Sequence, residues 1–266
     1  MRMRLRWALV SGIGLCLACA SLSPADPSAS FAACIVASNA CGGGRIEVTI
    51  DGGFKPTRLS KKKLAPAHFR IEETIGMADG SNPPPLRELV LEIDRNAALN
   101  ARGLPACGLG KIKNATTSQA LKACRPALVG EGAMVVSYFE RSSLFPKEKL
   151  LVFNGGSKDG RATIYIHTYL MTPISAPLVM TAMISKVHRG RYGTKLAISV
   201  PLFAEGSGFI KKFQLEFFRR FAYKQKKQSF VRARCFDGKL QAKAASIFSE
   251  GPPVVGVFWR SCTTRS

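Results

Sequence analysis

Apolar and polar residues alternate along most of the chain, and this period of two is typical of half-buried antiparallel strands. The alternation is clear over 46–50, 69–75 and 89–93, and its longest run covers 209–223. One acid, Glu73, falls on the apolar face of the second run. Each run predicts a strand with one face in the core and the other in water.

Short turn motifs separate these runs. Asp51-Gly52-Gly53 and Asn154-Gly155-Gly156 supply the positive-φ positions that tight turns need. Asp237-Gly238 lies between the runs 231–236 and 239–248, which predicts a tight hairpin between these two runs. The runs between turns number about ten to twelve, which is typical of β-sandwiches. The predicted fold class is therefore all-β, an antiparallel sandwich or meander.

One helix is predicted within this β-rich chain. Residues 116–119 match a Thr-x-x-Gln capping box, the following residues up to 124 favour a helix, and a proline two positions later ends it. Because Cys107 and Cys124 flank this helix, we expect 104–126 to form a small lobe held by a disulfide. A disulfide that closes a loop of this size adds about 3 kcal/mol to the free energy of unfolding in the chain-entropy model.

The first residues have the composition of an export signal. Three arginines within residues 1–6 precede an apolar stretch at 8–17, and Ala18-Cys19-Ala20 offers the small-x-small pattern that signal peptidase recognises. We predict a signal peptide over 1–20. Cleavage as late as residue 32 is one alternative, and a lipoprotein modified at Cys19 is another. The mature chain then has an N-terminal segment, 21–44, and a β-rich domain, 45–266, which could consist of two halves meeting near 141–148.

The cysteines agree with export to an oxidising compartment. Six remain after removal of the signal peptide, and an even number in an exported chain predicts disulfides. The mature chain has no Cys-x-x-Cys and only three histidines, so no metal site is predicted. No apolar run long enough for a membrane-spanning helix follows the signal. We expect a secreted or cell-surface protein, and proximity favours the pairs Cys34–Cys41, Cys107–Cys124 and Cys235–Cys262.

Charge is the strongest departure from an ordinary composition. Hydrophobic residues make up 46% of the chain, which is enough for a packed core, but 39 Lys and Arg stand against 17 Asp and Glu. Loss of residues 1–20 leaves 36 basic residues against 17 acidic ones, a net charge of +19. This balance predicts attraction to polyanions such as acidic wall polymers, anionic lipid headgroups, extracellular DNA or acidic polysaccharides. The alternative is that the charged side chains bind no partner and only keep the strand faces and edges soluble and unpaired.

Three segments concentrate the basic residues. No nucleic-acid-binding module is present, so specific recognition of nucleic acid is not expected. The candidate polyanion-binding residues are Lys55, Arg58, Lys61, Lys62 and Lys63 in the first segment and Lys186, His188, Arg189, Arg191 and Lys195 in the second, while a third segment holds Lys211, Lys212, Arg219, Arg220, Lys224, Lys226 and Lys227.

Catalytic motifs are missing from the sequence. It contains no His-Glu-x-x-His, no Gly-x-Ser-x-Gly and no P-loop. Ser60 and Lys63 have the spacing of a serine–lysine pair, but they lie in a lysine-rich loop. His167 alternates with Tyr165 and Tyr169 on one face of an apolar strand, where either an aromatic ladder or a ligand-facing group fits. We predict no enzyme, no catalytic residue and no cofactor.

An alternative function rests on strands that are apolar on both faces, 128–139 and 178–184. This pattern is typical of a central strand in a two-layer packing. It also fits a curved sheet that encloses a lipid-like ligand, with adaptable methionines on its wall. The protein would then be an envelope carrier, and the ligand would contact Met134, Met171, Met180 and Met183.

Several segments carry a resemblance that spans most of the mature chain. They include Gly103-Leu104-Pro105-Ala106-Cys107, which is the most distinctive, and Phe54-Lys55-Pro56, Asp79-Gly80-Ser81-Asn82-Pro83-Pro84, Phe153-Asn154-Gly155-Gly156 and Arg260-Ser261-Cys262. With these the chain resembles a family of uncharacterised exported proteins of high-GC Gram-positive bacteria. The resemblance implies export, a β-rich fold and the bridges Cys107–Cys124 and Cys235–Cys262. It implies no activity, and Cys34 and Cys41 are not part of it.

The function predicted from the sequence is that of an exported, non-enzymatic binding or structural protein of the cell envelope, with a basic surface attracted to anionic polymers or lipid headgroups. The apolar carrier is the second hypothesis and an enzyme is the third.

Overall fold

The computed structural model describes residues 33–38, 45–138, 147–158, 161–171 and 175–265. These residues are mostly β-strand, and none of their helices is long and apolar enough to cross a membrane. The helical elements are α1 Thr117–Cys124 and the 3-10 turns Leu109–Lys111, Arg125–Ala127 and Ala204–Gly206. The strands are β1 Ala33–Ser38, β2 Arg45–Lys55, β3 Arg58–Ser60, β4 Ala65–Met77, β5 Leu86–Asp94, β6 Ala97–Leu99, β7 Leu128–Tyr138, β8 Lys147–Lys158, β9 Arg161–Leu170, β10 Ala176–Arg189, β11 Tyr192–Ser199, β12 Gly208–Phe217, β13 Arg220–Tyr223, β14 Lys226–Ser229, β15 Val231–Ala233, β16 Lys239–Phe248, β17 Val254–Ser261 and β18 Thr263–Arg265.

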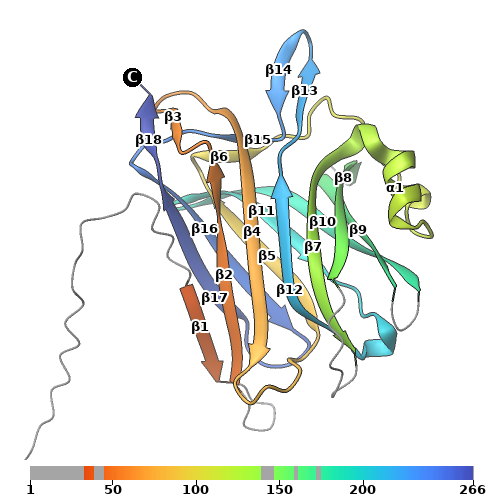
Figure 1. The fold of residues 1–266 in the computed structure, drawn as a ribbon. Coiled ribbons are helices and arrows are strands. Elements are labelled where there is room, and N and C mark those ends of the chain that lie inside the picture. The colour runs from red at the N-terminus through yellow and green to blue at the C-terminus, as the bar shows by residue number, and fades with distance from the viewer. Residues whose placement is uncertain (1–32, 39–44, 139–146, 159–160, 172–174, 266) are drawn as a thin grey trace, which may run out of the picture.

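Within the described ranges, fourteen strands form one antiparallel sheet. Twelve follow the order β1-β2-β4-β12-β7-β8-β9-β10-β11-β5-β16-β17, and β15 pairs with β4 and β6 beside this path. The sheet curls until β17 packs beside β1 and β2 (Figure 1). At this closure Gly52 and Gly53 lack the Cβ atoms that would collide with Phe258 and Arg260 of β17.

Strands from both sides of the segment 141–148 are interleaved in the sheet. β12 lies between β4 and β7, and β5 lies between β11 and β16. β7 and β8, which flank this segment, pair directly with each other. Most of the segment, 141–146, is outside the described residues.

The apolar faces predicted from the alternation line the inside of the curl. Ile46, Val48 and Ile50 of β2 and Phe69 and Ile71 of β4 are all at most 1% exposed. Full burial of such a side chain stabilises the fold by roughly 1.5–3 kcal/mol. The same alternation places charged residues of these strands on the outer face.

Glu73 lies in this core and is completely buried. Its Oε1 accepts a hydrogen bond from Ser246 of β16, and its Oε2 has no partner among the described residues. Burial raises the pKa of this carboxyl from 4.5 to about 7, against the opposing effect of the Ser246 hydrogen bond. The core therefore accommodates Glu73 in its protonated form below this pH, without a compensating cation.

The predicted lobe covers the outer face of the sheet at β8, β9 and β10. α1 begins at the predicted capping box, with both reciprocal hydrogen bonds between Thr116 and Gln119 present. Cys107 and Cys124 form a disulfide, and apolar residues of the lobe pack against Phe153 of β8. The predicted all-β antiparallel fold with one short disulfide-bound helix is thus confirmed.

The second predicted bridge, Cys235–Cys262, is also present. It holds the C-terminal end of the chain near β3, with which β18 forms a short parallel pair. The third predicted bridge, between Cys34 and Cys41, lies outside what the structure describes.

The predicted hairpin at Asp237-Gly238 is wrong. β15 pairs with β4 and β6, whereas β16 pairs with β5 and β17. Gly238 does have a positive φ of 82°, so a turn is present. Cys235 is bonded to Cys262, and Asp237 is bound by Arg191, so these contacts carry the chain between two different parts of the sheet.

The run 209–223 is two strands rather than one. β12 ends at Phe217, and the N–H groups of Phe218 and Arg219 then both donate to Val129 O. The chain continues as the separate β13–β14 hairpin. Both strands are half-buried, so apolar and polar residues continue to alternate across the break. The period of two therefore could not reveal where β12 ends.

Candidate functional site

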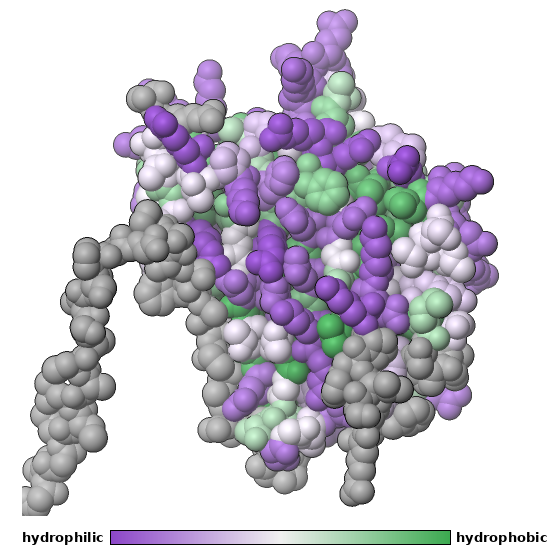
Figure 2. All heavy atoms as spheres, viewed as in Figure 1, coloured by the Kyte–Doolittle hydropathy of each residue, from purple (hydrophilic) through white to green (hydrophobic). Residues whose placement is uncertain are grey.

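The loops of the basic segments meet at one end of the curled sheet, the upper end in Figure 1. The strand registers show this directly, since β2, β10, β12 and β17 finish there and β4, β7, β11 and β16 begin there. We call the surface formed by 55–64, 186–192 and 219–239 the basic end. Figure 2 shows hydrophilic side chains projecting from the top of the molecule. Lys211 and Lys212 of the third segment lie away from this end in β12, where Lys212 pairs with Glu72 and Lys211 Nζ donates to Ser81 O at 3.3 Å.

Chain segments that cross or flank this end contain long stretches without acids. Six Lys or Arg lie between Asp51 and Glu72, and seven lie between Glu216 and Asp237. Another six lie in the connection from Asp94 to β7, which includes the lobe. Concentration of one sign of charge at one end produces a directed positive potential rather than an evenly solvated surface.

The lysines of the first segment project from a loop whose backbone is fixed. Ser60 Oγ accepts hydrogen bonds from the N–H groups of Lys62 and Lys63, at 3.3 and 3.1 Å. Cys235 N–H donates to Ser60 O at 3.0 Å, and Arg234 Nη1 donates to Lys62 O at 3.3 Å. The three adjacent lysine side chains are exposed. The Ser60–Lys63 spacing is therefore a turn, and the loop presents its ammonium groups with little backbone ordering left to occur on binding.

The β13–β14 hairpin of the third segment projects beyond the sheet (Figure 1). Its tip residues Lys224 and Gln225 have positive φ, 47° and 59°, which is the backbone of a type I′ turn that usually holds Asn-Gly. Lys224, Lys226 and Lys227 are exposed. Tyr223 packs on Gly103, where a Cβ would lie 2.2 Å from the ring. The hairpin therefore presents its lysines to solvent on a turn of defined backbone geometry.

We expect Gln225→Gly to raise the free energy of unfolding by about 0.5–1 kcal/mol, because glycine adopts a positive φ without the steric cost that Gln pays. Urea denaturation followed by circular dichroism measures the change. Gln228→Gly in β14 is the matched control and should lower stability by a similar amount. A loss of stability in both variants would contradict the turn geometry.

The second segment is only partly available for binding. Lys186 and His188 are exposed near the end of β10, and Lys195 is half-buried on β11. The side chain of Arg189 lies outside the described part of the chain. Arg191 was predicted to bind polyanions, but its guanidinium is occupied by partners within the protein.

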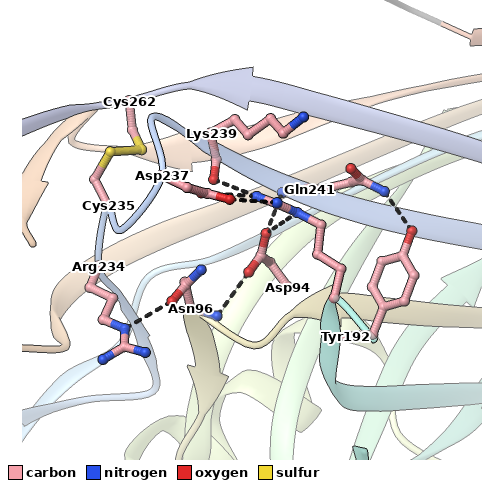
Figure 3. Close-up of polar contacts among 10 residues, drawn as sticks. Asp94, Asn96, Tyr192, Arg234, Cys235, Asp237, Lys239, Gln241 and Cys262 are labelled. Atoms are coloured by element: carbon pink, nitrogen blue, oxygen red, sulfur yellow. Dashed lines mark hydrogen bonds and ion pairs between the residues drawn. A yellow bond between two sulfur atoms is a disulfide. The ribbon is translucent and has the colours of Figure 1, made fainter. Parts of the chain in front are cut away.

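Arg191 connects β11 to two distant segments. It forms ion pairs with Asp94 at 2.8 Å and with Asp237 at 2.6 Å, and it donates to Lys239 O at 2.9 Å. Its hydrogen bond lowers the pKa of Asp237. Asp94 is completely buried and also accepts hydrogen bonds from the N–H groups of Asn96 and Gln241, at 2.9 and 3.1 Å (Figure 3).

Sequence reasoning missed two arginines of the basic end. Arg232 Nη2 donates to Leu64 O at 3.0 Å, and Arg234 Nε donates to Asn96 Oδ1 at 2.9 Å. Both hold the lysine loop in place while adding positive charge beside it. The acid-free stretch between Glu216 and Asp237 is the signal that could have found them.

No family model, curated protein or solved structure matches the chain.

His167 lies beneath the lobe rather than in an open site. It is completely buried, and its Nε2 is 2.9 Å from Ala115 O. Burial lowers the pKa of the imidazole, and the hydrogen bond to the backbone opposes this shift. A neutral His167 that donates to Ala115 O is a structural contact between the lobe and β9. In the described residues no group of three or more His, Cys, Asp or Glu could hold a metal ion.

The methionines proposed for an apolar ligand do not share one surface. Met134 and Met180 are buried inside the curl, whereas Met171 and Met183 are exposed. The cavity that the first two line is entirely apolar and has a volume of about 20 Å³. This is room for about one water and far below the roughly 300 Å³ of a small-ligand site.

Proposed function

We propose that the protein is an exported, non-enzymatic binding protein whose basic end associates with anionic polymers of the cell envelope. The observation that supports this most directly is the convergence of the loops of three basic segments at one end of the sheet. The N-terminal sequence and the two disulfides support export.

Three described acids near this end pair with arginines rather than with its lysines. Asp94 and Asp237 both pair with Arg191, and Asp51 pairs with Arg260. The exposed lysines of the 61–63 loop and of the hairpin tip therefore determine the local potential. Their spacing along two separate projections suits a flexible polymer that can contact both.

The proposal is tested by the salt dependence of binding to polygalacturonate, measured by fluorescence anisotropy between about 50 and 200 mM salt. Neutralising the loop in Lys61→Gln/Lys62→Gln/Lys63→Gln should weaken affinity about tenfold and reduce the slope of log K against log salt by about 2. The same measurement is made with vesicles that contain anionic lipid. Tighter binding to the vesicles than to polygalacturonate would identify lipid headgroups, and not the polymer, as the partner.

The matched control is Lys147→Gln/Lys149→Gln/Lys243→Gln, which removes the same charge from exposed or half-buried positions outside the three basic segments. This control should keep most of the affinity. Equal losses in the two triple variants would show delocalised attraction to net charge and would overturn the basic end as the binding surface.

A further inference from the structure

A pocket opens on the wall of the sheet just below the basic end, and its arginines belong to none of the predicted binding segments. It has a volume of about 310 Å³, at the lower limit of the roughly 300–1,000 Å³ typical of small-ligand sites. Its polar lining comes from four strands and includes Lys55, His68, Arg70, Glu216 and Arg260.

Two glycines create the floor of this pocket. A Cβ on Gly53 would lie 2.9 Å from Cγ of Arg260, and a Cβ on Gly52 would lie 2.5 Å from Arg70 O. A Cβ on Gly52 would also lie 2.8 Å from the ring of Phe258 in β17. The close approach of β17 to β2 therefore depends on the absence of side chains at these two positions of β2. The Arg260 side chain lies over the bare backbone of Gly53 as a result.

The two guanidinium groups are held in place by carboxylates. Arg260 pairs with Asp51 and also donates to Trp259 O at 3.1 Å, while Arg70 pairs with Glu72. A guanidinium has five N–H donors, and these contacts occupy only some of them. The Arg70 side chain is 43% exposed and that of Arg260 is 21% exposed, so donors remain accessible from the pocket.

The rest of the lining suits hydroxyl groups. Glu216 is 43% exposed, with His68 Nδ1 3.7 Å from its Oε1, and Thr57 and Ser261 contribute hydroxyls. Arginine binds carboxylate and phosphate in a bidentate manner, and a carboxylate accepts hydrogen bonds from sugar hydroxyls. Glu216 would repel a second anionic group, which disfavours a dense phosphate chain.

We propose that this pocket binds a single anionic sugar unit. Arg70 and Arg260 bind its carboxylate or phosphate, and Glu216 accepts hydrogen bonds from its hydroxyls. This inference rests on the proposed function, because the unit would be one residue of the polymer that the basic end attracts. Electrostatic attraction to the basic end then brings the polymer to the protein, and the pocket selects the type of sugar unit.

The test is calorimetric titration of the mature chain with galacturonate, glucose 6-phosphate and neutral cellobiose at about 150 mM salt, where long-range attraction is screened. We expect binding of at least one anionic sugar and none of cellobiose. The first two ligands distinguish a carboxylate unit from a phosphate unit.

Gly53→Ala is the decisive variant because it displaces Arg260 without changing the net charge. It should weaken binding of the anionic sugar at least tenfold and leave the slope of log K against log salt for polygalacturonate unchanged, because it alters no lysine of the basic end. Gly76→Ala is its control, since a Cβ there meets nothing within 4 Å. Arg70→Gln, at a half-exposed position, should also weaken binding of the sugar.

Equal binding of cellobiose, absence of binding by both anionic sugars, or full affinity in both Gly53→Ala and Arg70→Gln would overturn the pocket. Failure of the proposed function looks different, because the lysine-loop variant would then bind the polymer as tightly as the natural sequence.

Discussion

Replacing Glu73 with glutamine is expected to raise the free energy of unfolding by about 3 kcal/mol at about pH 8, and to change it little at about pH 4. Glutamine has nearly the same shape as the protonated acid and can keep the hydrogen bond to Ser246. The variant therefore removes ionisation at this position while leaving the packing of the core in place.

The sign follows from the raised pKa of Glu73. In the unfolded chain the carboxyl ionises near 4.5, whereas in the folded protein it holds its proton up to about pH 7. Between these values the folded state binds more protons, so this group lowers stability as pH rises. Below the unfolded value the penalty vanishes, and above about pH 7 it is constant.

Urea denaturation of the natural sequence and of Glu73→Gln at several pH values measures the difference, in which the titration of all other groups cancels. Glu131→Gln is the control, because Glu131 forms a surface pair with Lys149 at 3.3 Å and such pairs contribute about 0–1 kcal/mol. A difference between natural sequence and Glu73→Gln that does not depend on pH would contradict a protonated Glu73 in the core.

Arg191→Ala is expected to lower the free energy of unfolding by about 3–5 kcal/mol, because it leaves the buried carboxylate of Asp94 without its cation. Asp94 would keep only its hydrogen bonds from the N–H groups of Asn96 and Gln241. The same change also removes the ion pair of Asp237, but Asp237 is more exposed, so this loss lowers the free energy of unfolding by less.

Thermal and urea denaturation measure this loss, and Arg95→Ala is the matched control. Arg95 is exposed, so its removal should change stability by less than about 0.5 kcal/mol. Adding Asp94→Asn to Arg191→Ala should recover part of the loss, since a neutral amide needs no cation and its one oxygen can still accept one of the two backbone hydrogen bonds. Similar free energies of unfolding for Arg191→Ala and Arg95→Ala would contradict a structural role of Arg191 and would leave its guanidinium available for binding.

The candidate site was visible in the sequence only in pieces. The lysines of 61–63 and of the hairpin tip were found from charge alone and are exposed. Arg191 has the same charge, but its role depends on Asp94 and Asp237, which are distant in sequence and close only in the fold. Arg70 and Arg260 were missed for the same reason, because their pocket exists only where β17 closes against β2.

The sequence by itself determined which residues face the core, because a strand's side chains alternate between its faces and burial selects the apolar set. It also determined the lobe, since the capping box and the Cys107–Cys124 bridge act over short stretches of chain. Strand order was decided only by tertiary structure, and with it the meeting of the loops of the basic segments. Alternation has the same period in every strand, so it cannot specify that β4 lies between β2 and β12 or that the chain at Asp237 leaves one part of the sheet for another.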